Sequence, residues 1–131
     1  KDARRCYQAL DKRLGKFGLE LAKEKTNIIR FSKFQIEERK SFEFLGFVFR
    51  WGISKQGKCI VTRRTSPKKL RKALRSFKEW CKANRNRQLK DLFELLNAKL
   101  RGYYNYYGVI GNRSSIKLFH YKITAILYKM A

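Results

Sequence analysis

The residues of this sequence whose types and spacing best support a chemical role are cations. Between residues 63 and 90, twelve side chains are Lys or Arg, and Glu79 alone is acidic. The whole 131-residue chain has 33 Lys+Arg, 10 Asp+Glu and a net charge of +23. Such a charge opposes compaction, and a bound polyanion relieves it. The composition therefore favours a nucleic-acid partner over an acidic membrane surface or a merely soluble basic protein.

The spacing of these cations arranges some of them as a row. If the apolar residues between 70 and 81 form the buried stripe of one helix, several cations project together from its other side. This row consists of Lys68, Lys72, Arg75 and Lys82. It can follow a phosphate backbone and release counterions, whereas an ordinary solvated face usually mixes charges of both signs. We predict nucleic-acid contacts at Arg63, Arg64, Lys68, Lys72, Arg75, Lys82 and Arg85.

A second unusual segment is LNAKLRGYYNYYG, residues 96–108, which holds four of the seven tyrosines. On a helix, Tyr103 and Tyr107 continue an apolar stripe and are predicted to be core. Tyr104 and Tyr106 turn away near Arg101, where they either stack on bases or pack on neighbouring structure with only their hydroxyls exposed. Both interpretations stay open, and Arg101, Tyr104 and Tyr106 join the predicted nucleic-acid-binding residues. Gly102 indicates a close approach by another helix or by a nucleic-acid backbone.

Residues suited to metal or redox chemistry are scarce. Cys6, Cys59 and Cys81 lie far apart and only one His accompanies them. We therefore expect three small buried cysteines in a reducing compartment, with no zinc site or disulfide. Asp91 and Glu94 share a helix face among leucines and cations, where ion pairing is their expected use. We predict no metal site, no cofactor and, without an apolar run of 18 residues, no membrane span.

The elements that position these residues follow from hydrophobic periodicity. Residues 2–17 predict a helix that stops at Gly18, and TNIIRF (26–31) predicts a strand. FEFLGFVFRW (42–51) predicts one strand with apolar residues on both faces. A turn at Gln56-Gly57 joins it to KCIVTRR (58–64) as a hairpin.

The pattern becomes helical after Ser66-Pro67, a helix N-cap followed by proline at the first helical position. Helices are predicted at about 67–84, 88–107 and 114–130, with Ser114 or Ser115 capping the last. The predicted apolar stripes are Leu70, Leu74, Phe77 and Cys81; Leu89, Leu92, Phe93, Leu96 and Leu100; and Ile116, Phe119, Ile123, Ile126 or Leu127, and Met130. The expected fold class is α+β: a helix and short antiparallel strands, followed by a three-helix bundle.

Three segments, in this order and at these intervals, resemble group II intron-encoded reverse transcriptase/maturases. They are GLELAKEKTNIIRF (18–31), FEFLGFVFRWG (42–52) and LNAKLRGYYNYYG (96–108). The resemblance covers nearly the whole chain, and the ordered set is far more specific than FLGF or EKT alone. It implies that residues 1–62 are the C-terminal part of a polymerase palm and residues 66–131 a thumb or maturase (X) domain. We accordingly expect the chain to be part of a longer protein.

The same resemblance implies roles for individual residues. Phe44, Leu45, Gly46 and Phe47 match a primer-grip hairpin, which holds the primer end. Lys25 matches a lysine near the incoming nucleotide, as an accessory catalytic candidate, although a lysine at a strand start is the alternative. The family's YxDD carboxylates, which would hold two metal ions, do not occur. We therefore expect this chain to bind rather than to polymerise, with Mg²⁺ belonging to a parent RNA-directed DNA polymerase.

The resemblance implies group II intron RNA or a template–primer duplex as partner, in a bacterial cytoplasmic ribonucleoprotein. An alternative is a stand-alone basic helical module that reads DNA by a helix–turn–helix within residues 67–107, with Asn84 and Asn86 near the turn. Apolar side chains left bare on the strands, Phe42, Phe44 and Phe49, would also allow the isolated chain to dimerise.

Overall fold

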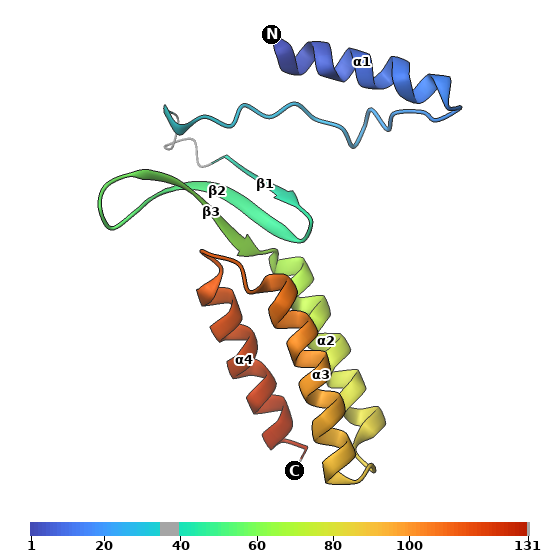
Figure 1. Cartoon of the computed structure of the whole chain (residues 1–131), viewed down its shortest axis with the longest axis vertical. Coiled ribbons are helices and arrows are strands. Elements are labelled where there is room, and N and C mark those ends of the chain that lie inside the picture. Colours follow the sequence, from blue (N-terminus) through green and yellow to red (C-terminus); the bar gives the residue numbers. More distant parts are fainter. Residues whose placement is uncertain (35–39, 131) are drawn as a thin grey trace. The chain divides into compact units, whose positions relative to one another are not determined.

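The computed structural model describes residues 1–34 and 40–130 and divides into two compact units, Lys1–Phe31 and Ser32–Ala131 (Figure 1). In the first unit, α1 spans Asp2–Lys16, as predicted. It ends where Gly18 adopts a φ of 70°, and the Leu19 N–H donates to the Leu14 carbonyl at 3.0 Å. The boundary predicted between residues 62 and 66 separates two family domains, whereas this division separates two compact units of the structure. That predicted domain boundary stays a prediction.

The predicted strand TNIIRF is wrong, since residues 26–31 have no strand conformation. An extended segment becomes a strand only when a neighbour satisfies its backbone hydrogen-bonding groups. The strands of the described residues all belong to the second unit, so the β-branched run has no partner within its own unit.

The second unit begins with an antiparallel sheet in the order β1-β2-β3, formed by Ser41–Phe44, Phe47–Ile53 and Cys59–Thr65. The hairpin with its turn near Gln56-Gly57 is confirmed, because Ile53 pairs with Cys59 and Gly57 has a φ of 75°. The single strand predicted for residues 42–51 is wrong. Leu45 and Gly46, with φ of 51° and 81°, reverse the chain so that Phe44 pairs with Phe47. Two central residues with positive φ make the tight turn that suits the twist of a hairpin.

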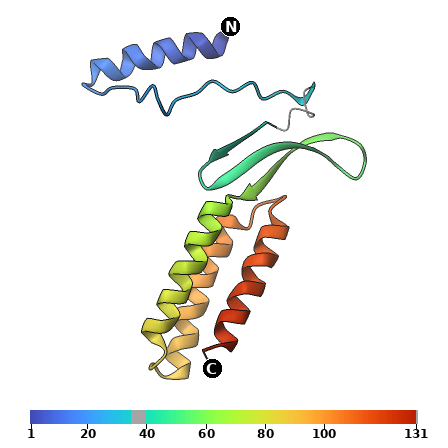
Figure 2. The same ribbon diagram turned by 180° about the vertical axis from the view of Figure 1, so that it is seen from behind.

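Three long helices complete the second unit: α2 (Pro67–Asn84), α3 (Leu89–Tyr107) and α4 (Arg113–Tyr128). They run side by side from one end of the sheet, as both ribbon views show (Figures 1 and 2). All three predicted helices are confirmed. The N-cap of α4 is Asn112, so the predicted cap at Ser114 or Ser115 is wrong.

The core lies inside this bundle and consists of Phe77, Cys81, Leu96, Phe119 and Ile123. The stripes predicted for α2 and α4 therefore face inward. The stripe of α3 is only partly right, because Leu89 and Phe93 are 71% and 55% exposed. Cys6 and Cys59 are exposed as well, so the expectation of three buried cysteines holds for Cys81 alone. Within the described residues, none of the helices is long and apolar enough to cross a membrane.

Candidate nucleic-acid interface

The turn between β1 and β2 is exposed and conformationally costly. Leu45 occupies the left-handed region at φ 51°, where a residue with a Cβ loses about 1–2 kcal/mol, and its side chain is 66% exposed. Gly46 takes φ 81° without that steric cost. Backbone strain of this kind persists only where the surrounding structure enforces it, and it concentrates at functional sites.

Three contacts from the helices enforce this turn. The backbone N–H of Ser66, the N-cap of α2, donates to the Gly46 carbonyl at 2.8 Å. The Tyr106 hydroxyl donates to the Leu45 carbonyl at 2.8 Å. The Tyr107 hydroxyl lies against Gly46, where an added Cβ would meet it at 3.0 Å. The structure thus brings the predicted primer-grip residues together with one predicted nucleic-acid-binding residue, Tyr106.

Aromatic packing continues from the turn into the bundle. Phe47, which is 8% exposed, stacks on Tyr106 with ring centroids 5.9 Å apart and meets Tyr107 at 5.3 Å. Tyr103 stacks on Phe119 of α4 at 3.6 Å. Tyr106 still leaves 51% of its surface exposed beside the turn.

Tyr104 takes a different position from Tyr106. Its hydroxyl hydrogen-bonds His120 Nδ1 at 3.2 Å, and its ring meets Phe119 edge-on, so it packs on α4 rather than on the hairpin. Arg101 is exposed one turn earlier on α3. Gly102 has open space where a Cβ would lie, so no helix of the described chain approaches it and that alternative is wrong. Close approach by a nucleic-acid backbone stays a prediction.

Burial favours the neutral form of three tyrosine hydroxyls, those of Tyr103, Tyr104 and Tyr107. Burial, reinforced by the neighbouring Tyr107, raises the pKa of Tyr103 to about 12. Burial also raises the pKa of Tyr104, and burial together with Tyr106 and Glu43 raises that of Tyr107. The Tyr103 hydroxyl is buried without a hydrogen-bond partner among the described residues. At neutral pH these groups therefore remain uncharged hydrogen-bond donors.

Asn112 joins the sheet to the ends of α3 and α4. Its side chain is fully buried, its Oδ1 accepts from the Thr65 N–H at 2.8 Å, and its Nδ2 donates to Thr65 Oγ1 at 2.7 Å and to the Tyr107 carbonyl at 2.8 Å. The sequence analysis missed this residue, and its only signal was an asparagine just before a helix. Lys69, which lines the hollow at the turn with Tyr106 and Tyr107, was missed as well.

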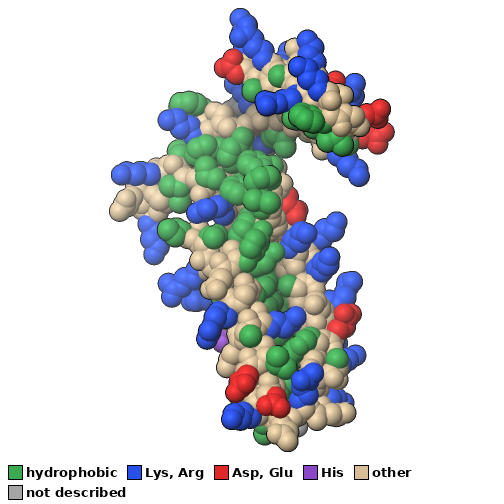
Figure 3. Space-filling model, turned by 45° about the vertical axis from the view of Figure 1, so that its right-hand side comes forward, with side chains coloured by type: hydrophobic (Ala, Val, Ile, Leu, Met, Phe, Trp, Pro, Cys, Tyr) green, Lys and Arg blue, Asp and Glu red, His purple; other side chains and the backbone are tan. Residues whose placement is uncertain are grey.

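The predicted basic row is exposed along α2. Lys68, Lys72, Arg75 and Lys82 are all exposed, and Lys and Arg side chains follow the bundle in the space-filling view, with far fewer acids (Figure 3). On β3, Arg64 is exposed and Arg63 half-buried, and their side chains point to opposite faces.

At the far end of α2, Lys82 also contributes to a hollow of about 270 Å³ against α4. We call it the distal hollow; it is lined by Lys78, Lys82, Arg85, Ile126, Lys129 and Met130. Four cations converge here, and none of the described acidic side chains lines the hollow. The charge arrangement suits an anion.

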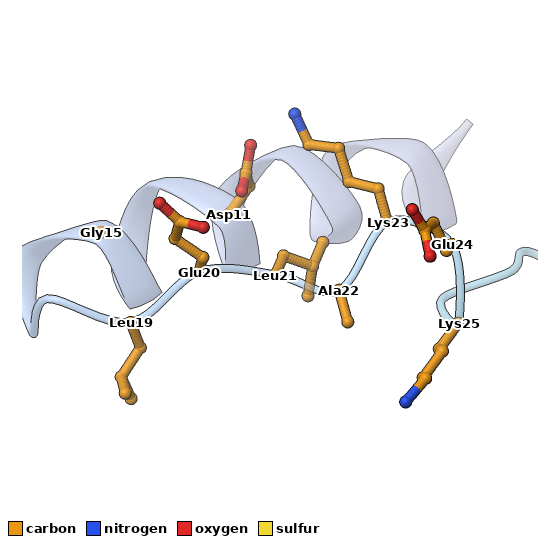
Figure 4. A pocket seen from close by; sticks show the side chains of 9 residues that line it. All are labelled: Asp11, Gly15, Leu19, Glu20, Leu21, Ala22, Lys23, Glu24 and Lys25. Carbon is orange, nitrogen blue, oxygen red and sulfur yellow. The ribbon is translucent and has the colours of Figure 1, made fainter.

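Lys25 lies in the first unit, on a hollow that also contains Asp11, Glu20 and Glu24. Its amino group points away from the carboxylates of Asp11 and Glu20 (Figure 4). Across the described chain, no group of three or more His, Cys, Asp or Glu side chains is placed to hold a metal ion. These carboxylates do not fit the Mg²⁺ expected for a polymerase.

Comparison with known proteins adds one finding. Residues 68–131 match the family model described as group II intron, maturase-specific domain. No curated protein and no solved structure matches the chain significantly.

Proposed function

This chain is a relative of the group II intron maturases, with their specific domain at residues 68–131, and from that premise we propose that it binds structured RNA. The interface runs from the β1–β2 turn along the basic row of α2. The RNA is that of a group II intron, or a template–primer duplex in a parent that copies RNA into DNA. The parent's Mg²⁺-dependent chemistry uses residues that this chain does not contain, and the complex is a ribonucleoprotein of the bacterial cytoplasm.

The observation that carries the proposal is the exposed cationic row on α2. Neighbouring cations three and four residues apart repel each other, at about 0.2–0.5 kcal/mol per pair. Lys68, Lys72 and Arg75 repel one another in this way, and Glu79 is the only acid on their helix that could offset the repulsion. A phosphate backbone converts this repulsion into attraction and releases counterions. Binding of a polyanion to the row is therefore more favourable than leaving the row in contact with water.

The row starts beside the turn, because Lys69, the residue after Lys68, lines the hollow at the turn. The Ser66–Gly46 hydrogen bond fixes the first turn of α2 beside the hairpin. From there the 18 residues of α2 extend about 27 Å at 1.5 Å per residue. A-form duplexes are recognised through shape, phosphates and 2′-hydroxyls rather than base edges. A rigid rod of cations that starts at a fixed turn suits such a ligand.

The distal hollow would hold a further phosphate at the other end of the rod. The C-termini of α2 and α4, each equivalent to roughly half a negative charge, oppose an anion there. Four full positive charges outweigh them. The hollow thus supports RNA contact along the whole of α2.

The experiment that tests the proposal is a salt titration of binding to an RNA hairpin, an RNA–DNA hybrid and B-form DNA of equal length. The triple variant Lys68→Ala/Lys72→Ala/Arg75→Ala is compared with a control that removes the same charge from α1, Lys12→Ala/Arg13→Ala/Lys16→Ala. With roughly 0.9 in the log–log slope per phosphate contact, the α2 variant should flatten the slope by about 2–3. The α1 variant should change it far less, and the A-form ligands should bind more tightly.

Equal flattening by both triple variants would show that only net charge matters, and the proposal would fail. Equal affinity for B-form DNA would instead favour the alternative, a stand-alone DNA-binding module. The helices do not support that alternative, because α2 and α3 run side by side (Figures 1 and 2), whereas a helix–turn–helix crosses its two helices at about 90–120°.

A further inference from the structure

Helix α4 has apolar side chains on two opposite faces. One face, with Phe119 and Ile123 at its centre, is buried against the bundle. The other face points outward and carries Leu118, Tyr121, Ala125 and Tyr128, all exposed. Leu118, Tyr121 and Tyr128 are 43%, 72% and 80% exposed. We call these four residues the outer seam of α4.

The spacing of the outer seam is that of a helix-packing surface. Positions 118, 121, 125 and 128 alternate steps of three and four residues, which is the a/d repeat of two helices that pack along each other. Single exposed apolar residues are ordinary, but four in register on one face are not. A helix that is apolar on both sides is typical of one covered on both sides.

The charges beside the seam determine what kind of helix fits. Lys117, Lys122 and Lys129 occupy the flanking e and g positions and are exposed. No acid follows Glu94 in the sequence. A second copy of this chain would set lysine against lysine and add its own +23 charge, so like-charge repulsion opposes self-pairing. Glutamates or aspartates at the partner's flanking positions would instead pair with the lysines.

A groove on the sheet extends this surface beyond the start of α4. Leu118 lines it together with apolar residues of β2, including Val48 and Ile53. Two more cations, Arg50 and Arg64, lie in the same groove, and no acid from residues 1–34 or 40–130 lines it. The combination of apolar contact and positive charge therefore continues from the seam into the sheet.

We propose that the outer seam of α4, flanked by Lys117, Lys122 and Lys129, binds an acidic amphipathic helix of a partner protein. This surface shares no residue with the RNA-binding row on α2, and Lys129 is common to its flank and the distal hollow. Leu118 and Ala125 offer nothing to RNA, whereas both fill an a/d seam. With 16 residues, α4 presents about 24 Å of surface, which is more than two heptads.

The test uses a designed helical peptide of about three heptads, with Leu at the a and d positions and Glu at e and g. Its own glutamates prevent it from pairing with itself. A scrambled peptide of identical composition is the control, since it feels the same non-specific attraction to a basic protein. Fluorescence anisotropy should show the patterned peptide binding the full chain at least tenfold more tightly than the scrambled one.

Variants of the chain locate the binding. The tenfold preference should disappear in Leu118→Ser/Tyr121→Ser and in Ala125→Glu, the latter keeping a good helix former on an exposed position. It should persist in Leu89→Ser/Ile110→Ser, which removes exposed apolar side chains elsewhere. Circular dichroism confirms that each variant is folded.

Equal binding of the two peptides by the wild type, or an undiminished preference in Ala125→Glu, would overturn the proposal. So would a loss of RNA-hairpin affinity in Leu118→Ser/Tyr121→Ser as large as that in the triple variant Lys68→Ala/Lys72→Ala/Arg75→Ala, because the seam would then be an RNA surface. Failure of RNA binding along α2 would leave the peptide result unaffected, so the two proposals fail separately.

Discussion

Replacing Asn112 with alanine should destabilise the second unit more than any other polar substitution in it. The change removes one hydrogen-bond acceptor, Oδ1, and one donor group, Nδ2, from a fully buried position. It leaves the Thr65 N–H without its partner, and Thr65 Oγ1 loses a donor. The Tyr107 carbonyl loses the Asn112 amide but keeps the Val109 N–H at 2.9 Å. A buried group that loses its hydrogen bond costs about 1–3 kcal/mol. The Thr65 hydroxyl can turn toward Tyr103 and the Tyr107 carbonyl keeps one donor, so we expect a total of about 2–4 kcal/mol.

Urea unfolding followed by circular dichroism measures this cost. With a slope of about 2 kcal/mol per molar urea, the midpoint should fall by about 1–2 M. The control is Asn105→Ala, which changes the same residue type at an exposed position of α3 and should shift stability by less than about 0.5 kcal/mol. Asn112→Asp should cost as much as alanine, because a carboxylate oxygen would face the Tyr107 carbonyl in place of Nδ2.

A midpoint shift below about 0.5 M for Asn112→Ala would refute this reasoning. It would mean that water enters the joint and satisfies the freed groups, so that the sheet and the bundle do not depend on the asparagine. Retention of full stability in Asn112→Asp would show, in addition, that the carboxylate is protonated or that the joint opens.

Three further predictions concern the turn and the tyrosines. Gly46→Ala should cost about 1–2 kcal/mol from φ 81° and additionally displace Tyr107, whereas Gly57→Ala, at φ 75° with open space, should show the backbone cost alone; urea midpoints compare the two. Leu45→Asn should raise stability by about 1 kcal/mol, because asparagine tolerates the left-handed region, and lower RNA affinity if the apolar tip contacts RNA. Tyr103 has a folded-state pKa of about 12 against about 10 unfolded, so stability is full below pH 10 and falls as the pH rises toward 12; Tyr103→Phe should flatten this fall in denaturant titrations and leave stability at pH 7 unreduced.

The helices could be predicted from the sequence because their signals are local. Leucine spacing, Ser66-Pro67 and the glycines after Tyr107 define α2 and α3 within one residue of their observed limits. The Leu45-Gly46 turn could not, since leucine disfavours positive φ and the flanking phenylalanines continue an apolar run. The turn exists because Ser66 and Tyr106 bind its two carbonyls, and both contacts come from elements distant in sequence.

The candidate site could be predicted only where it depends on one helix. The basic row follows from periodicity, so the exposure of Lys68, Lys72 and Arg75 was expected and is found. The different contacts of Tyr104 and Tyr106 could not be predicted, because they depend on whether α4 or the hairpin lies beside each ring. Asn112 could not be predicted either, because it forms hydrogen bonds to three backbone and side-chain groups that only the fold brings together.

The two parts of the proposed interface, the β1–β2 turn and the basic row of α2, should affect RNA binding in different ways. The turn, the start of α2 and the end of α3 are joined by the Ser66–Gly46, Tyr106–Leu45 and Asn112–Thr65 hydrogen bonds. A turn fixed in this way is ordered before RNA arrives, which lowers the entropic cost of binding without adding charge. Loosening the turn should therefore reduce affinity by the same factor at every salt concentration. Losing a cation of the row should change the slope itself, because one fewer phosphate is neutralised. If a substitution at the turn altered the salt slope, the turn would contribute to binding through a cation and not through its ordered shape.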